Sequence, residues 1–234
     1  MRERVSLTAA RASPRRVAVS VEVALLTPRG KELSTLLRRQ PDLRARERWM
    51  LPWDGARGEE SLENAADRIA RDALGVAPAW LEQVGAFGNA RRHPAETDLS
   101  IAYVGLVPVD APEPGGGEEA WFALSDLPVL PPRHKQVIDA AFELTRSRLD
   151  YVPIAFRLLP PTFTLSDLQS IYEIILGRRL HKASFRRALH AAWLVEPTDE
   201  WRTEQRGRPA QLFRFAPRRR RANRRGVRFE LLAG

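Results

Sequence analysis

Apolar residues in the first half of the chain recur in short runs with every second position apolar, or in continuous β-branched stretches. Both patterns are typical of β-strands. Turn-forming residues separate the runs, such as Pro28-Arg29-Gly30 after the first one. The predicted strands are residues 17–26, 33–39, 81–87, 99–107 and 120–124.

Two segments of this half show helical periodicity instead. The stretch from Leu51 to Val76 predicts a strand end, a glycine-bearing loop and an amphipathic helix. Ser61 can cap the helix start, and Gly75 suits its C-terminal end. The predicted apolar face comprises Leu62, Ala65, Ala66, Ile69, Ala73 and Leu74. A second helix is predicted over residues 132–149, so residues 16–150 should form an α/β/α sandwich.

The last third of the chain has a different pattern. A short helix over 152–159 precedes Pro160-Pro161, and a second begins after Thr164, whose side chain can cap it. That helix should end at Gly177, and a third follows over 182–192. Two apolar runs, 193–196 and 210–215, predict a hairpin. Three helices followed by a hairpin favour a winged helix-turn-helix over residues 151–216, so the whole chain should be an α+β protein.

Positive charge is concentrated in that last third. Residues 1–150 hold 21 Lys and Arg against 22 Asp and Glu, whereas residues 151–234 hold 17 against 7. This asymmetry indicates binding to nucleic acid, since basic side chains displace the counterions of phosphates. We expect residues 1–15 to form a flexible arm and the arginine-rich residues 217–234 to form a basic tail that adds non-specific attraction.

The predicted third helix is the candidate reader of the DNA major groove. Arginine and lysine suit guanine edges and phosphates, and a serine hydroxyl suits either. The hairpin adds an Arg-Gly-Arg sequence suited to a minor groove. The predicted DNA-binding residues are Lys182, Ser184, Arg186, Arg187, His190, Arg206 and Arg208. The competing interpretation is an ordinary solvated surface.

The helix of residues 62–74 and its preceding loop resemble the Nudix box. Glu60, Arg68, Gly75 and Val76 fall in register with that family's pattern. The glutamates that hold divalent cations in the family are replaced here by Ile69, Asp72 and Ala73. Because hard cations need several carboxylate oxygens, the box of Glu60, Arg68 and Asp72 is degenerate. We expect a domain that binds a nucleotide-like ligand without cleaving it, with no metal cofactor, although weak Mg²⁺ binding stays possible.

The combined pattern resembles the Nudix-related transcriptional regulators of the NrtR family. The most specific segments are residues 151–189 and 206–215, and residues 87–107 also match. The resemblance implies a homodimeric repressor of NAD-metabolism or pentose-utilisation operons. It implies a Nudix-like domain that senses ADP-ribose or a related sugar phosphate, and two winged helices that bind a palindromic operator.

The candidate ligand-binding residues are Trp53, Arg91, Arg92 and His134. Trp53 can stack on an adenine or close the sandwich. The two arginines can pair with a pyrophosphate, and His134 can contact ligand or cap its helix. Glu60 should bond the loop backbone or pair with Arg68, while Asp54 leaves an unorthodox metal site open.

Two other functions stay open alongside a regulator. An active Nudix hydrolase that cleaves ADP-ribose-type pyrophosphates needs carboxylates that this box lacks. A general RNA- or chromatin-binding protein would bind without a preferred site. The absence of cysteine excludes disulfides and thiolate-ligated metals, and no long apolar run is present. We therefore expect a cytoplasmic, nucleoid-associated protein without membrane contact.

Overall fold

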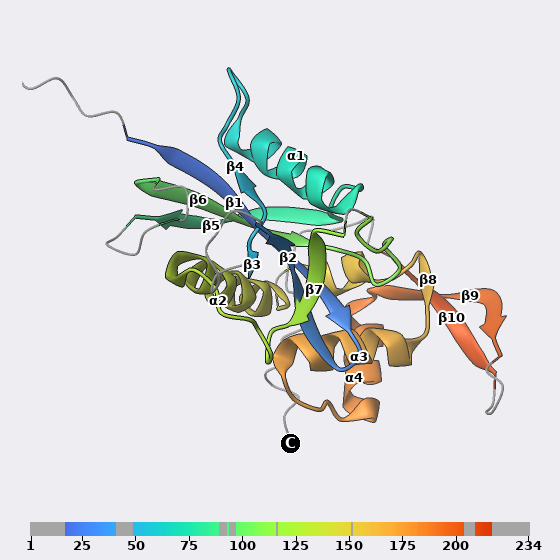
Figure 1. Cartoon of the computed structure of the whole chain (residues 1–234). Coiled ribbons are helices and arrows are strands. Elements are labelled where there is room, and N and C mark those ends of the chain that lie inside the picture. Colours follow the sequence, from blue (N-terminus) through green and yellow to red (C-terminus); the bar gives the residue numbers. More distant parts are fainter. Residues whose placement is uncertain are drawn as a thin grey trace, which may run out of the picture.

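The computed structural model describes residues 17–40, 49–88, 93, 97–115, 117–150, 152–203 and 209–216. Its first half is a mixed β-sheet between two helices (Figure 1). The strands are β1 (Val19–Arg29), β2 (Glu32–Arg39), β3 (Trp49–Met50), β4 (Trp53–Asp54), β5 (Trp80–Phe87), β6 (Leu99–Leu106) and β7 (Glu119–Ala123). The helices are α1 (Leu62–Leu74) and α2 (Pro132–Arg148). The predicted α/β/α sandwich is confirmed.

The sheet has the order β3-β2-β1-β6-β5, with β4 paired to β1 and β7 paired to β2. Strands β1 and β6 run parallel over eight residue pairs, which makes β1 the buried centre of the sheet. In the antiparallel β1–β4 pair, Val21 lies opposite Asp54 and Glu22 lies opposite Trp53. Since neighbouring residues of a strand point to opposite faces, Trp53 and Asp54 face opposite sides of the sheet.

Helix α1 follows the prediction at both ends. The Ser61 side chain accepts a hydrogen bond from the Asn64 backbone, and Gly75 adopts a left-handed conformation with φ 76°. Its buried face contains Ala65, Ala66, Ile69, Ala70, Ala73 and Leu74. Leu62 was predicted to be part of this face but is the first residue of the helix and is 38% exposed.

The last third contains η1 (Ile154–Leu158), β8 (Thr162–Phe163), α3 (Leu165–Leu176), α4 (Lys182–Ala192), β9 (Val195–Arg202) and β10 (Ala210–Phe215). Thr164 and Asp167 form a full capping box at the start of α3, as the sequence suggested. Three details differ from prediction. The first short helix is a 3-10 helix, strand β9 extends to Arg202, and β8 joins the hairpin as a third strand.

One hydrophobic core joins the α2 face of the sheet to the winged helix. It runs from Leu26 and Leu51 through Ile138 on α2 to Phe185 and Leu189 on α4. A smaller core on the other face packs α1 against the sheet. The two predicted units are therefore packed together, with α3 in contact with both α2 and strand β2 of the sheet. In the described part of the chain, no helix combines the length and the apolar character needed to cross a membrane.

Candidate functional site

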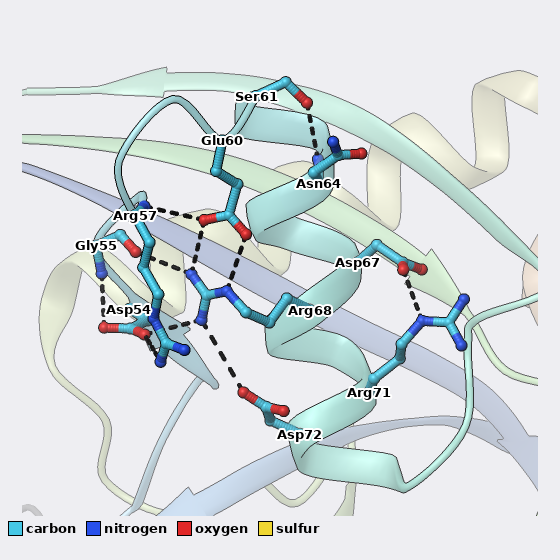
Figure 2. A network of polar contacts seen from close by, with 10 residues as sticks. All are labelled: Asp54, Gly55, Arg57, Glu60, Ser61, Asn64, Asp67, Arg68, Arg71 and Asp72. Atoms are coloured by element: carbon cyan, nitrogen blue, oxygen red, sulfur yellow. Dashed lines mark hydrogen bonds and ion pairs between the residues drawn. The ribbon is translucent and has the colours of Figure 1, made fainter.

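Arg68 is the centre of a cluster of ion pairs at the loop before α1 (Figure 2). Its Nε donates to Glu60 Oε1 at 2.9 Å, and its Nη1 donates to Asp54 Oδ2 at 2.8 Å. Its Nη2 donates to Glu60 Oε2 and to the Gly55 carbonyl. Arg57 also donates to Asp54 Oδ2, and its backbone N–H to Glu60 Oε2. Both expected roles of Glu60 are confirmed, because it bonds loop backbone and pairs with Arg68.

These contacts occupy every carboxylate oxygen of Asp54 and Glu60, since Asp54 Oδ1 accepts the Gly55 N–H. Hydrogen bonds from Arg68 and Arg57 hold the pKa of Glu60 below its usual range. Burial opposes ionisation of Asp54, but its bonds to Gly55, Arg57 and Arg68 outweigh that effect and lower its pKa. Asp72 lies 4.0 Å from Arg68 Nη1 and is more than half exposed. A guanidinium thus stands among the acidic groups of the box.

Trp53, whose side chain faces the side of the sheet opposite to Asp54, lines a cavity of about 240 Å³. The cavity lies between β2 and the β3–β4 segment, and its walls are Arg38, Arg39, Gln40, Met50, Leu51, Trp53 and Glu118. Arg38 is held by Glu119 through a 2.8 Å ion pair but remains one-third exposed. The cavity is therefore lined by a tryptophan and two arginines, and the Arg38 guanidinium donates to Glu119 and to the Asp72 carbonyl.

A buried polar cluster lies directly behind that cavity wall. It consists of Glu22 on β1, His93 from the loop before β6, and His134 in the first turn of α2. The His93 ring packs edge-on against Trp53, and its Nε2 lies 3.3 Å from Glu22 Oε1. His134 Nδ1 accepts the Leu51 N–H at 3.1 Å, while its Nε2 lies 3.9 Å from Glu22 Oε2.

Burial sets the protonation of these three groups. It raises the pKa of Glu22, against hydrogen bonds from Ser100 and Ser20 and the charge of Arg133. Burial and the charge of Arg133 lower the pKa of His93 to about 4. Burial, His93 and Arg133 lower the pKa of His134 to about 3. At neutral pH both imidazoles are therefore neutral, and the Leu51 N–H fixes the His134 tautomer with its proton on Nε2.

The predicted ligand-binding residues are distributed unevenly. Trp53 lines the cavity, whereas His134 lies behind it, and the capping role considered for His134 is wrong because Pro131 precedes the helix without a side-chain cap. Arg91 and Arg92 lie outside the described residues. Sequence reasoning missed Arg38, Arg39, Glu22 and His93. Glu22 could have been found, because it is a lone carboxylate within an apolar strand sequence.

Helix α4 presents basic side chains to solvent. Lys182, Arg187 and His190 are exposed, while Phe185 and Leu189 bury the opposite side. Arg186 is half-buried, and its Nε is shielded without a hydrogen-bond partner among the described residues. These positions match a helix that can enter a groove of DNA.

The remaining predicted DNA contacts are differently placed. The Ser184 hydroxyl is 3.1 Å from His181 Nδ1, so it is already engaged at the start of α4. Arg206 and Arg208, which come between β9 and β10 in the sequence, lie outside the described residues. Arg202 on β9 has a structural role, because it donates to both oxygens of Asp167 in the α3 cap.

Comparisons with known proteins match both halves of the chain. Residues 155–215 match the family model of the NrtR DNA-binding winged helix domain. The ADPR responsive transcriptional repressor NtrR of Acinetobacter baylyi is 31% identical over 205 residues, covering 85% of this chain and 82% of that protein. Shewanella oneidensis NrtR in complex with a 27mer DNA matches with a TM-score of 0.71 and 28% identity, covering 85% of this chain and 93% of that one.

A third likeness concerns the fold alone. A MutT/nudix family protein from Enterococcus faecalis matches with a TM-score of 0.70 at 19% identity. The match covers 87% of this chain and 90% of that one. The joining of a Nudix-like sandwich to a winged helix therefore recurs at low sequence identity.

Proposed function

Because this chain belongs to the NrtR family of transcriptional regulators, we propose that it binds double-stranded DNA and represses transcription until an effector releases it. The observation that carries the proposal is the winged helix, whose α4 exposes Lys182, Arg187 and His190. The related Shewanella protein was crystallised with a 27mer DNA. A homodimer that binds a palindromic operator follows from the same reasoning, since paired reading helices match two half-sites.

We propose ADP-ribose as the effector, as the name of the Acinetobacter relative suggests. The cavity beside Trp53 offers an aromatic surface for a base and arginine side chains for a pyrophosphate. Its volume of about 240 Å³ is below the ~300–1,000 Å³ typical of small-molecule sites. It therefore suits one end of the ligand, with the remainder extending over the adjoining surface.

The domain should not hydrolyse this ligand. Pyrophosphate cleavage in this fold would use divalent cations held by carboxylates. Here Asp54 and Glu60 are already satisfied by Arg68, Arg57 and backbone N–H groups. A cation would have to displace a guanidinium from both acids. This supports an effector-sensing role over the alternative of an active Nudix hydrolase.

Selection of bound duplexes from a random DNA pool at moderate salt tests the DNA-binding proposal. An inverted repeat is the expected outcome, and recovery of no motif would contradict sequence-specific regulation. On the selected site, Arg187→Ala and Arg186→Ala should each weaken binding by about 1–3 kcal/mol if the side chain contacts a base. Arg71→Ala is the matched control, because Arg71 is an exposed helical arginine on α1 that pairs with Asp67.

The effector proposal needs two measurements on the same protein. Titration with ADP-ribose should show binding, and Trp53→Ala should weaken it, since the indole ring is lost from the cavity wall. ADP-ribose should also weaken binding to the selected operator. Incubation with ADP-ribose and Mg²⁺ or Mn²⁺ should release no AMP, and steady AMP release lost in Glu60→Gln would establish the hydrolase instead.

A further inference from the structure

The buried cluster of Glu22, His93 and His134 is joined to the cavity wall through backbone and ring contacts. Leu51 lines the cavity, and its N–H donates to His134 Nδ1. Trp53 lines the cavity as well, and its ring contacts that of His93. Any displacement of the wall by a bound molecule therefore reaches the two imidazoles directly.

Two histidines and a carboxylate are also a set that can hold a transition metal. One feature argues against a metal here. The Leu51 N–H needs the Nδ1 lone pair of His134, so the Nε2 that faces the cluster carries the proton and is a donor rather than a metal ligand.

The cluster instead contains a donor and an acceptor that lie just too far apart to form a hydrogen bond. His134 Nε2 and Glu22 Oε2 are both fully buried and have no hydrogen-bond partner among the described residues. They lie 3.9 Å apart, about 1 Å beyond hydrogen-bond length. A buried donor and a buried acceptor that are left unpaired both destabilise the folded state. A small shift of the α2 start toward β1 would remove that destabilisation.

Helix α2 carries such a shift to the DNA-binding part. Its first turn holds His134, and its body packs through Ile138 and Ala141 into the core that continues to α3 and α4. Helices α2 and α3 are in contact, and the Val152 N–H bonds the Arg148 carbonyl at the exit of α2. Among the described residues, packed side chains and backbone hydrogen bonds therefore connect the cavity wall to the winged helix.

We propose that Glu22 and His134 form an effector-operated latch: ADP-ribose in the Trp53 cavity closes the Nε2–H···Oε2 bond, and the movement of α2 repositions the winged helix. The inference rests on the proposed function and assigns positioning roles to two residues that touch neither ligand nor DNA. The latch supplies a differential free energy between two states, which an effector requires in order to shift operator affinity.

Two substitutions of His134 separate its two bonds. In His134→Asn the amide oxygen can still accept the Leu51 N–H, but the donor toward Glu22 is lost. In His134→Gln the amide NH₂ can still reach Glu22, but the acceptor for Leu51 is lost. Lys135→Ala is the control, because Lys135 is exposed on the same turn of α2. Glu22→Gln, which keeps the side-chain volume, is a second route if a His134 variant does not fold.

The measured quantity is the ratio of operator Kd with and without saturating ADP-ribose. The ratio in both His134 variants should fall at least fivefold toward unity, while operator Kd without effector stays within twofold of wild type. The Lys135→Ala protein should keep the wild-type ratio. By NMR, the His134 Nε2–H resonance of the wild type should move downfield when ADP-ribose is added, as expected for a bond that shortens.

Three results would overturn the latch. One is a wild-type ratio in folded His134→Asn, because the bond to Glu22 would then be dispensable. Another is one equivalent of bound zinc in the purified protein, which would make the cluster a metal site. The third is an operator affinity of the wild-type protein that does not change when ADP-ribose is added. Of the three results, only this one would also contradict the proposed effector. If ADP-ribose still weakens operator binding in the His134 variants, the latch is excluded but the proposed effector is not.

Discussion

Asp54 and Trp53 are adjacent in the chain, yet they belong to two polar clusters that differ in almost every physical respect. Asp54 faces the α1 side and joins Arg68 and Glu60 in a half-exposed network of full charges (Figure 2). Trp53 faces the α2 side and covers Glu22, His93 and His134, which are buried. One cluster neutralises its acids with arginine, and the other keeps its imidazoles uncharged.

The difference separates a cluster whose hydrogen bonds are all formed from a cluster that has one more hydrogen bond to form. The α1-side cluster satisfies every oxygen of Asp54 and Glu60, so it fixes the loop in a single arrangement. The α2-side cluster leaves a donor and an acceptor unpaired at 3.9 Å. The proposed latch uses this pair, because closing it would give the α2-side cluster a second, hydrogen-bonded arrangement, as a switch requires.

The largest expected effect comes from removing the buried acid. Glu22→Ala should lower the free energy of unfolding by about 3–5 kcal/mol, because it opens a cavity and removes the buried acceptor of Ser20 and Ser100. Urea denaturation of variant and wild type measures this. A loss below 1 kcal/mol would mean that the α2-side cluster contributes no more than a surface group, and the contrast between the two faces would fail.

Acid should affect the two clusters in separate pH ranges. The pKa values of His93 and His134 fall from 6.5 to about 4 and about 3, so the unfolded chain binds protons that the folded one excludes. Stability should therefore fall as pH drops from 6.5 to 5. Each histidine contributes up to about 1.4 kcal/mol per pH unit, and the raised pKa of Glu22 opposes part of this slope.

The α1-side acids have lowered pKa values, so their contribution is lost only below about pH 4.5. Urea denaturation at half-unit pH intervals separates the two ranges. Glu60→Gln should leave the slope between pH 6.5 and 5 unchanged and reduce the slope below it. A flat profile between pH 6.5 and 5 in a Glu22→Gln background would contradict the lowered pKa values of the two histidines.

Removing the central arginine should have a smaller effect. Arg68→Ala should cost about 1–2 kcal/mol, since Arg68 itself is 18% exposed and Asp54 is 41% exposed, which weakens each ion pair through solvent screening. Thermal unfolding with and without Mg²⁺ gives a second readout. Mg²⁺ should stabilise this variant more than the wild type, because only in the variant are Asp54 and Glu60 released from the Arg68 guanidinium.

Asp72 should matter least. It retains a carboxylate at a former metal-ligand position, but it is 55% exposed and 4.0 Å from Arg68. Asp72→Ala should change the free energy of unfolding by no more than about 0.5 kcal/mol. A larger loss in the same denaturation series would place Asp72 inside the Arg68 network and enlarge the α1-side cluster.

The sequence by itself determined most of the local structure. Ser61, Thr164, Gly75 and Gly177 mark the ends of helices through short-range hydrogen bonds and left-handed backbone conformations, which depend on neighbouring residues only. The pairing of Glu60 with Arg68 was also predictable from the sequence. The two residues are only eight positions apart, so the pairing depends on one loop and the start of one helix. Periodicity overestimated the apolar face at Leu62, because spacing alone does not reveal where a sheet ends.

Tertiary structure alone decided what lies behind the cavity wall. Glu22, His93 and His134 are separated by 71 and 41 positions in the numbering, and no local pattern relates them. They meet because the β1–β6 pairing and the packing of α2 bring a strand centre, a loop and a helix start to one point. Their altered pKa values follow from burial, a property of the assembled core that no single segment of sequence carries.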